Sequence, residues 1–227
     1  MMTELSRKAS ANQATDAPLA TIRGHRELYE KTRHLFSSAK VEIACAANDM
    51  FTWVSEKVSP PHPSPTPPGF SVRKLYRPGV LLDPVATRHL RGMAEYGAQI
   101  RITPDEINET MLIDRRVVIM AGDLSHGERS FSVVWAAEVV QAVGSLYEAA
   151  WRAATELADY DRELAELRTL APRILSLLGS GCKDETAART LSLSVRTYRR
   201  RVAELMTALG ATSRFQAGVK ARELGLV

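Results

Sequence analysis

Hydrophobic and polar positions follow helical and strand periods in turn along the first two thirds of the chain. Apolar residues at helical spacing predict a helix from Thr21 to about Lys40. Asp83 followed by Pro84 predicts the capped start of a second helix, which runs to about Tyr96. Short apolar runs bounded by turn residues predict a set of strands. These strands cover residues 41–46, 71–76, 98–102, 110–113, 117–120 and 131–135.

Helical periodicity returns at Ala136 and continues, as one long or broken helix, to about Leu167. This order of elements predicts an α/β domain with a mixed sheet over residues 21–150, followed by a linker helix over 151–167. An acidic run toward the end of the linker helix is typical of a solvated connection. Apolar residues at roughly helical spacing favour instead a dimerisation or domain-coupling helix. These residues are Ala150, Ala154, Leu157, Leu164 and Leu167.

Two segments follow neither period. Residues 1–20 are polar, rich in Ala, Ser and Thr, and aperiodic, which predicts a disordered tail. Residues 59–69 read SPPHPSPTPPG and hold six of the eleven prolines. No helix or central strand forms at that proline density, so a loop with polyproline character is predicted there.

The C-terminal segment, residues 168–227, divides into four short predicted helices. They lie over residues 173–178, 184–191, 195–209 and 214–224. Pro172 is expected near the start of the first helix, where proline is tolerated. Asp184, Ser194 and Ser213 are the predicted N-caps of the other three helices.

The third of these helices has an apolar stripe and an arginine-rich opposite face. The stripe consists of Val195, Tyr198, Val202, Leu205 and Leu209. Arg196 and Arg200 lie on the opposite face, with Arg199 at its border. Two short helices, a tight turn and arginines on the exposed N-terminal half of the second helix are typical of a helix-turn-helix motif. There, guanidinium groups read guanine edges while flanking cations and hydroxyls contact phosphates. The alternative is a small helical bundle with a solvated basic face.

Charge is distributed unevenly along the chain, whose net charge is +4. Residues 165–227 hold 11 of the 30 Lys and Arg but only 5 of the 26 Asp and Glu, a net charge of +6. Residues 1–164 hold the other 19 and 21, a net charge of −2. A basic tail on a mildly acidic body predicts a polyanionic partner, although charge alone does not distinguish nucleic acid from acidic protein or membrane.

Composition excludes several other classes of protein. The 45% hydrophobic content supports a sizeable core, and no apolar run approaches the roughly 20 residues that span a bilayer. The first residues lack the apolar stretch of a secretory signal. Cys45 and Cys182 lie far apart without CxxC spacing, so neither a disulfide framework nor a structural metal site is expected. We therefore expect a cytoplasmic protein with no membrane partner.

The segment LLGSGCKDETAARTLSLSVRTYRRRVAELMTALGATSRFQAGVKARELGLV resembles the C-terminal DNA-binding domain of LuxR-type transcriptional regulators. The residues that match the family pattern are Leu177, Leu178, Gly181, Ala188, Leu191, Ser194, Thr197, Arg199, Val202, Leu209, Gly210, Arg214 and Ala217. The match covers about the last 60 residues, and the register and the glycines agree throughout. The resemblance implies an all-α helix-turn-helix domain of four helices that binds double-stranded DNA.

The resemblance also implies roles for individual residues. Arg199 and Arg200 are expected to approach the bases. The residues expected to contact phosphates are Lys183, Ser194, Thr197 and Arg214. Arg196 is added from its helical position alone.

The segment departs from the family pattern at a few positions. Lys183 and Asp184 stand where Ser/Thr-Asn is usual, and Tyr198 replaces the usual Val. Arg201 replaces the common His, and we count it among the DNA-contacting residues. Two arginines directly after Arg199 predict an altered base preference rather than lost binding.

The strands before the tail resemble degenerate phospholipase-D-like, TrmB-type sensor modules, through MLIDRRVVIM and the following SFSVVW, over about residues 21–155. An active site of that family needs His-x-Lys-x4-Asp, in which the His acts as nucleophile or acid and the Lys holds phosphate. With Asp114 at the Asp position, Glu109 and Ile107 occupy the Lys and His positions. Because Glu109 would repel phosphate and Ile107 has no nucleophile, no catalytic residue is expected.

Other enzyme motifs are missing: the chain has no GxGxxG, Walker, HExxH or GxSxG pattern, and we expect no cofactor. We therefore expect a non-enzymatic regulator of transcription that binds DNA as a homodimer and senses a ligand or partner through its first domain. Trp53, Tyr76 and Trp135 are candidates for lining an effector pocket, although core packing explains each more simply. The alternative is a regulatory protein whose basic tail docks on another protein, which sequence preference would distinguish. A phosphodiesterase is disfavoured by the missing His-x-Lys.

Overall fold

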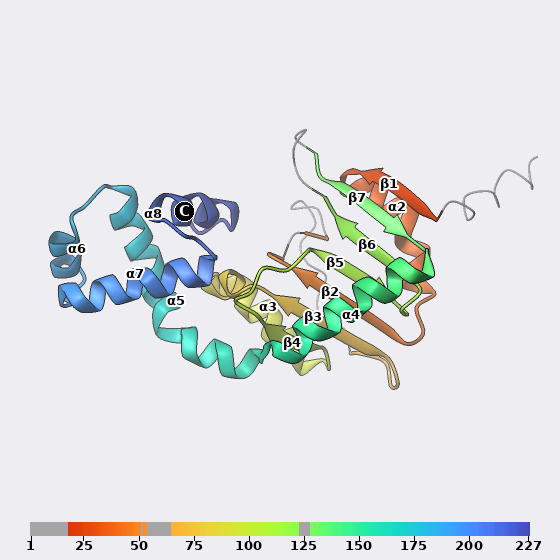
Figure 1. The fold of residues 1–227 in the computed structure, drawn as a ribbon. Coiled ribbons are helices and arrows are strands. Elements are labelled where there is room, and N and C mark those ends of the chain that lie inside the picture. Colours follow the sequence, from red (N-terminus) through yellow and green to blue (C-terminus); the bar gives the residue numbers. More distant parts are fainter. Residues whose placement is uncertain (1–17, 51, 54–64, 123–127) are drawn as a thin grey trace, which may run out of the picture.

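The computed structural model of the chain describes residues 18–50, 52–53, 65–122 and 128–227. A mixed eight-stranded sheet forms one part of the molecule, and a group of helices from the C-terminal part of the chain lies at one side of it (Figure 1). The strands are β1 (Leu19–Arg23), β2 (Glu42–Ala47), β3 (Ser71–Tyr76), β4 (Gln99–Ile102), β5 (Thr110–Ile113), β6 (Val117–Ala121), β7 (Ser130–Val134) and β8 (Thr155–Glu156). The helices are α2 (Gly24–Ser37), the 3-10 helix η2 (Pro78–Leu82), α3 (Pro84–Glu95), α4 (Ala137–Ala153), α5 (Leu157–Gly179), α6 (Asp184–Thr190), α7 (Val195–Leu209) and α8 (Arg214–Glu223).

The sheet changes from antiparallel to parallel at β2. The strand order is β1-β7-β6-β5-β2-β3-β4-β8, in which β2, β3 and β4 run parallel and all other neighbours are antiparallel. Ile43 of β2 pairs with Val72 of β3 on one side and with Ile113 of β5 on the other. The small side chains of EIACAA suit a strand covered on both faces. Because β2 and β3 are parallel, the segments that follow them emerge at the same end of the strands.

Helices cover both faces of the sheet. Consecutive residues of a strand point to opposite faces, and β6 shows this directly. Val118 packs with Val140 of α4, which lies across one face of the sheet (Figure 1). Its neighbour Ile119 packs with Leu28 of α2 on the other side.

Helices α5 to α8 share a hydrophobic core with the parallel end of the sheet. One continuous cluster of buried side chains includes Tyr76 of β3, Leu81 of η2, Ile174 of α5, Leu205 of α7 and Ala217 of α8. In the described part of the chain, no helix is both long and apolar enough to cross a membrane. Because the apolar cluster spans both parts, we expect sheet and tail to unfold in one transition.

Most predicted elements agree with the structure. The predicted strands correspond to β2 to β7, and the helices predicted over 83–96, 195–209 and 214–224 correspond to α3, α7 and α8. The Asp83 cap is confirmed, since its carboxylate accepts hydrogen bonds from the N–H groups of Val85 (2.8 Å) and Ala86 (3.2 Å).

The predicted helix over residues 21–40 is wrong at its start. Residues 19–23 form β1, in which Ile22 pairs with Phe131 of β7. Helix α2 begins only at Gly24, whose φ of 75° lets its N–H reach the carbonyl of Arg129 at 2.8 Å. The apolar residues of β1 and α2 together fit a helical period, and the sequence alone therefore predicts one continuous helix.

The predicted disordered tail and proline-rich loop are described only in part. Leu19 and Ala20, which belong to the tail as predicted, lie in β1. Residues 1–17 of the tail and 59–64 of the loop lie outside the described residues.

The predicted helix over 136–167 is broken by β8, which pairs with β4. Helix α5 then runs without interruption through residues 157–167 of the predicted linker and through the predicted first tail helix. Pro172 lies inside α5, contrary to the expectation that it marks a helix start.

The apolar stripe of the predicted linker helix is covered within the chain itself. Ala154, Leu157, Leu164 and Leu167 are buried, and three of them belong to the cluster shared by sheet and tail. The stripe therefore couples the two parts of the molecule. It leaves the predicted homodimer without the surface on which that prediction rested.

Candidate nucleic-acid interface

Helix α7 begins at a turn that exposes its first residues. Ser192 adopts a left-handed φ of 57° in the turn between α6 and α7. The Ser194 cap is confirmed: its Oγ accepts a hydrogen bond from the Thr197 N–H at 3.1 Å and lies 2.9 Å from Thr197 Oγ1. Two hydroxyls thus lie at the end of α7 where free N–H groups and the helix dipole favour an anion.

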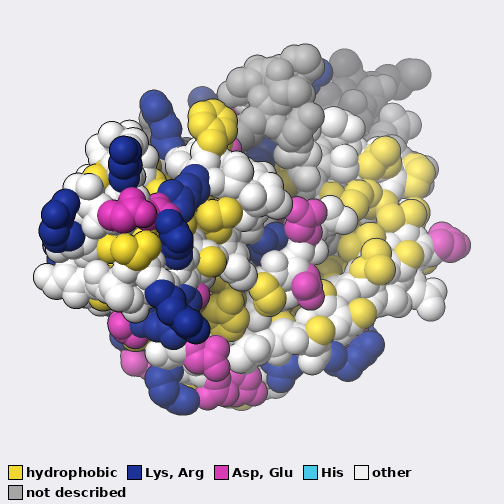
Figure 2. Space-filling view, turned by 60° about the vertical axis from the view of Figure 1, so that its left-hand side comes forward, with side chains coloured by type: hydrophobic (Ala, Val, Ile, Leu, Met, Phe, Trp, Pro, Cys, Tyr) yellow, Lys and Arg dark blue, Asp and Glu magenta, His cyan; other side chains and the backbone are white. Residues whose placement is uncertain are grey.

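Exposed cations from three helices surround this end of α7, and we call them the basic face. Its members are Lys183 before α6, Arg196, Arg199 and Arg200 on α7, and Arg214 at the start of α8. All five residues are exposed, and Figure 2 shows several Lys and Arg side chains spread over the visible surface of the tail, with acidic side chains between them. The structure therefore brings together five of the eight predicted DNA-contacting residues on one surface, next to Ser194 and Thr197.

A single carboxylate connects two arginines of the basic face. Asp184 Oδ2 accepts a hydrogen bond from Arg199 Nε at 2.7 Å, and Oδ1 accepts one from Arg214 Nη1 at 2.8 Å. These hydrogen bonds from Arg214 and Arg199 lower the pKa of Asp184 to about 2. The predicted cap is wrong here, since Lys183 is the N-cap of α6 and Asp184 makes no capping hydrogen bond. The Asp184 side chain holds α6, α7 and α8 together instead.

Replacement of Asp184 by asparagine is expected to reduce the loss of stability in acid. The pKa of Asp184 is lower in the folded protein than its ordinary value of 3.8, so its ion pairs stabilise the fold fully above about pH 4. That contribution disappears as the pH falls toward 2. Urea denaturation at a series of pH values between these limits should show a flatter pH dependence for Asp184→Asn. An unchanged pH dependence would contradict the assignment.

Arg201 lies apart from the basic face. Its side chain is only 13% exposed and forms an ion pair with Glu204 at 2.7 Å and another with Glu166 of α5. Hydrogen bonds to these carboxylates raise the pKa of Arg201. The structure thus turns Arg201 toward α5 and does not bring it together with the other predicted DNA-contacting residues. The sequence pattern missed this because Glu166 is distant in sequence.

Phe215 is a residue of this surface that the sequence analysis missed. It follows Arg214 in the first turn of α8, and it is 84% exposed. The buried positions of α8 are Ala217 and Ala221, so helical spacing from these two alanines would have placed Phe215 outside.

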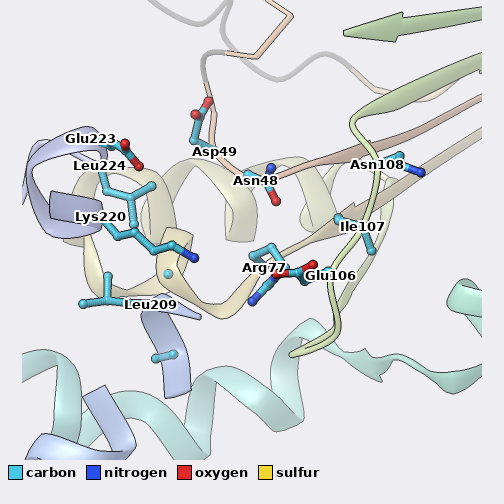
Figure 3. A pocket seen from close by; sticks show the side chains of 12 residues that line it. Asn48, Asp49, Arg77, Glu106, Ile107, Asn108, Leu209, Lys220, Glu223 and Leu224 are labelled. Atoms are coloured by element: carbon cyan, nitrogen blue, oxygen red, sulfur yellow. The ribbon is translucent and has the colours of Figure 1, made fainter. Parts of the chain in front are cut away.

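The opposite end of α7 is attached to the sheet domain beside a cleft of about 550 Å³ (Figure 3). The guanidinium of Arg77, just after β3, lies so close to Gly210 that an added Cβ would clash with it. Lys220 Nζ donates to the Gly210 carbonyl at 2.5 Å. Cations are favourable at a helix C-terminus, so these contacts fix the C-terminal end of α7 while its N-terminal half stays exposed.

Glu109 and Asp114, which the sequence comparison aligned with the Lys and Asp of a phospholipase-D-like motif, make structural contacts. The Glu109 carboxylate accepts a hydrogen bond from the Asn48 N–H at 3.1 Å and pairs with Arg129 at 2.9 Å. The Asp114 carboxylate accepts hydrogen bonds from the consecutive N–H groups of residues 40–42 at 2.8 to 3.0 Å. Glu109 thus connects the segments after β2 and before β7, and Asp114 connects the β5–β6 turn to the start of β2.

No protein-family model matches the chain. Its sequence is similar to that of the bialaphos biosynthetic pathway regulatory protein of Streptomyces hygroscopicus, with 31% identity over 162 residues. The similarity covers 70% of this chain and 62% of the Streptomyces protein. The chain therefore matches less than two thirds of the length of that regulatory protein.

Several solved structures are similar over most of the chain. TrmBL2, an archaeal chromatin protein described as having a novel mode of DNA binding, gives a TM-score of 0.47 at 15% identity, over 67% of this chain and 59% of its own. Nuc, a phospholipase D family member from Salmonella typhimurium, gives 0.44 at 12% identity, over 61% and 97%. NucT from Helicobacter pylori gives 0.43 at 9% identity, over 61% and 98%. All three TM-scores are below 0.5 and assign no function.

Proposed function

We propose that this protein is a transcriptional regulator that reads DNA sequence through α7, as a LuxR-type helix-turn-helix domain does. The observation that supports this is the basic face itself, with exposed cations around the N-terminal half of a helix capped by Ser194. Such a helix end enters the major groove, where arginine forks recognise guanine. The sequence similarity to a regulatory protein agrees with this role.

The geometry suggests a division of roles within the basic face. Asp184 fixes Arg199 and Arg214 before DNA arrives, which reduces the entropy lost on binding. Among the residues that the structure describes, the ion-pair partner of Arg200 is Glu204, at 3.6 Å on the surface, so its side chain can adapt to a base. Lys183 and the two hydroxyls at the start of α7 would contact phosphates.

The sheet domain would act as a non-catalytic sensor in this proposal. The ion pair of Glu109 with Arg129 and the role of Asp114 in holding residues 40–42 argue for structural use of the two positions. Contacts at the C-terminal end of α7 would transmit changes in the sheet domain to the DNA-reading helix. A homodimer on two half-sites stays a prediction, which the spacing of selected DNA sites would test.

The salt dependence of DNA binding tests the phosphate contacts. Lys183→Ala is expected to weaken binding to all duplexes by a similar factor and to reduce the slope of log K against log salt by about 1. Fluorescence anisotropy with a labelled duplex over a salt series measures both. Arg162→Ala removes an exposed charge from α5 and serves as the control, which should keep the wild-type slope. Equal slopes for all three proteins would contradict the assignment of Lys183.

Docking of the tail on another protein is the second candidate function. The exposure of Phe215 beside Arg214 favours it, because exposed aromatic and arginine side chains are frequent at protein interfaces. A Phe215→Ser variant that binds DNA like the wild type but loses a protein partner would support this candidate. Loss of sequence-specific DNA binding instead would place Phe215 in the DNA interface.

A further inference from the structure

Helix α4 rests on the sheet through few side chains. Only Val140, Tyr147 and Trp151 of its 17 residues are buried. Small residues line the space beneath it, among them Ala44 of β2 and Gly144 of α4. A cavity of about 740 Å³ remains between α4, the sheet and the β5–β6 turn, which is the size of a site for a small organic molecule.

Four paired charges form one wall of this cavity. Arg73 Nη2 lies 2.9 Å from Glu42 and 2.7 Å from Glu148. Arg115 pairs with the same carboxylates at 2.6 and 3.0 Å. The Arg73 guanidinium also lies 5.3 Å from the ring centre of Tyr147. These two cations and two anions balance, so this wall contributes no net charge.

Two more arginines give the cavity an excess of positive charge. Arg116 and Arg152 line it and are exposed. Within the described ranges, neither of them forms a direct ion pair, although Arg152 lies near Glu148 and Arg116 near Asp114 and each helps to lower the pKa of that carboxyl. The half-buried ring of Trp135 and the side chain of Val140 supply apolar surface nearby. Such a combination recognises an anion that carries an apolar body.

The turn that carries two of the cavity arginines is strained. Asp114 and Arg115 have left-handed φ angles of 51° and 54°, and the N–H of Arg116 closes the turn on the Ile113 carbonyl at 3.0 Å. Asn-Gly adopts this turn without strain, whereas an arginine at its second central position does not. Strained backbone of this kind concentrates at ligand sites.

Tyr147 is among the residues that line the same cavity, and its hydroxyl is buried beneath the surface. Its oxygen is buried and unsatisfied within the part of the chain that the structure describes. Burial raises the pKa of Tyr147, so the hydroxyl stays protonated and can donate.

We propose that the cavity beneath α4 binds a small organic anion, a carboxylate or phosphate on an apolar ring or chain. Arg116 and Arg152 hold the anionic group, and the apolar body lies against Trp135 and Val140. This anion would be the effector of the proposed sensor domain, and its effect on DNA rests on the proposed function. Binding itself does not depend on that function.

The chain offers a direct path from this cavity to the DNA-reading helices. In the last turn of α4, the carbonyl of Trp151 accepts a hydrogen bond from Arg101 of β4 at 2.8 Å. The chain then forms β8 on β4 and continues directly into α5. A ligand that holds α4 against the sheet therefore restrains the start of α5, which packs on α7 and α8 through the shared core.

Titration with defined anions tests the proposal on the full chain. Tryptophan fluorescence should change saturably with benzoate or with phenyl phosphate, and the stronger of the two identifies the anionic group. Benzyl alcohol lacks the charge and inorganic phosphate lacks the apolar body, so each should bind at least tenfold more weakly. Equal affinity for inorganic phosphate, or no saturable response to either aromatic anion, would overturn the proposal.

Two variants distinguish the contribution of the two arginine charges from that of the cavity volume. Arg116→Gln/Arg152→Gln should lower the affinity at least tenfold, whereas the control Arg26→Gln/Arg162→Gln removes two exposed charges elsewhere and should have no effect. Gly144→Leu keeps every charge and fills the cavity, so it should abolish the response. Far-ultraviolet circular dichroism checks that each variant is folded. Wild-type affinity in either cavity variant would overturn the assignment.

The effect on DNA is measured separately. The aromatic anion that binds should change the affinity for the selected duplex in the wild type and leave it unchanged in Gly144→Leu. If the protein binds no DNA sequence specifically, the fluorescence titration still gives its answer, so the two proposals fail independently.

Discussion

The Arg199→Ala/Arg200→Ala variant is expected to bind the selected duplex about 100-fold or more weakly than the wild type at near-physiological salt. Each bidentate contact between an arginine and a guanine is worth about 1–3 kcal/mol. Both side chains are exposed on the N-terminal half of α7, so their removal opens no cavity in the core. Anisotropy titrations with the selected duplex and with an unrelated duplex measure the specific and the non-specific affinity.

Arg199 and Arg200 should differ in their effect on DNA affinity when each is replaced singly by alanine. Arg199 is held by Asp184 at 2.7 Å, so its loss removes a contact that is already in position. In Arg199→Ala the carboxylate keeps Arg214, and the phosphate contact of α8 should survive. The Arg162→Ala protein again controls for the loss of an exposed charge. A similar, small loss of affinity for both duplexes would show that α7 contributes charge without reading bases.

Leu205→Ala should lower the free energy of unfolding by about 2–5 kcal/mol, the usual cost of emptying a fully buried leucine site. Leu205 is completely buried in the cluster that joins the sheet to the tail. For a chain of this length, a loss of about 3 kcal/mol corresponds to a fall in Tm of roughly 6–12 °C. Calorimetry should show one transition, displaced as a whole. The exposed Thr207→Ala on the same helix is the control, with an expected change within about 0.5 kcal/mol.

The number of transitions carries the structural information in that experiment. Tyr76 of β3 and Leu81 of η2 share the cluster with Leu205, so the sheet should melt with the tail. Two transitions, of which only one moves in Leu205→Ala, would contradict the shared core.

The sequence predicted elements whose signals are local. A serine before an amphipathic segment, as at Ser194, or Asp-Pro at residues 83–84, specifies a helix start through backbone atoms within a few residues. The hairpin at residues 110–120 was predicted for the same reason, because its two apolar runs are joined by a short turn. These signals need no knowledge of the rest of the fold.

Elements that depend on distant partners were missed. β1 is a strand because β7 offers it hydrogen bonds, and its own sequence had fitted the start of a helix. Pro172 lies within α5 because packing of the helix on both parts of the molecule outweighs the lost hydrogen bond. Tertiary contacts overrode local preference in both cases.

The candidate interface shows the same limit. Helical spacing placed Arg196, Arg199 and Arg200 on the exposed side of α7, but it could not assign their partners. Asp184 reaches two arginines that lie on two other helices, and Glu166 draws Arg201 toward α5. Charge at a position is a property of the sequence, whereas pairing requires the arrangement of the helices.

In vitro selection of genomic DNA fragments is the most direct test of the central claim that α7 reads DNA sequence. The wild type and Arg199→Ala/Arg200→Ala should be compared at near-physiological salt, where non-specific attraction to phosphates is weak. We expect the wild type to enrich a shared motif that the variant does not enrich, and two half-sites about one helical turn apart would support a homodimer. No common motif from the wild type, with and without cell extract as a source of effector, would contradict the account and favour docking of the tail on a protein.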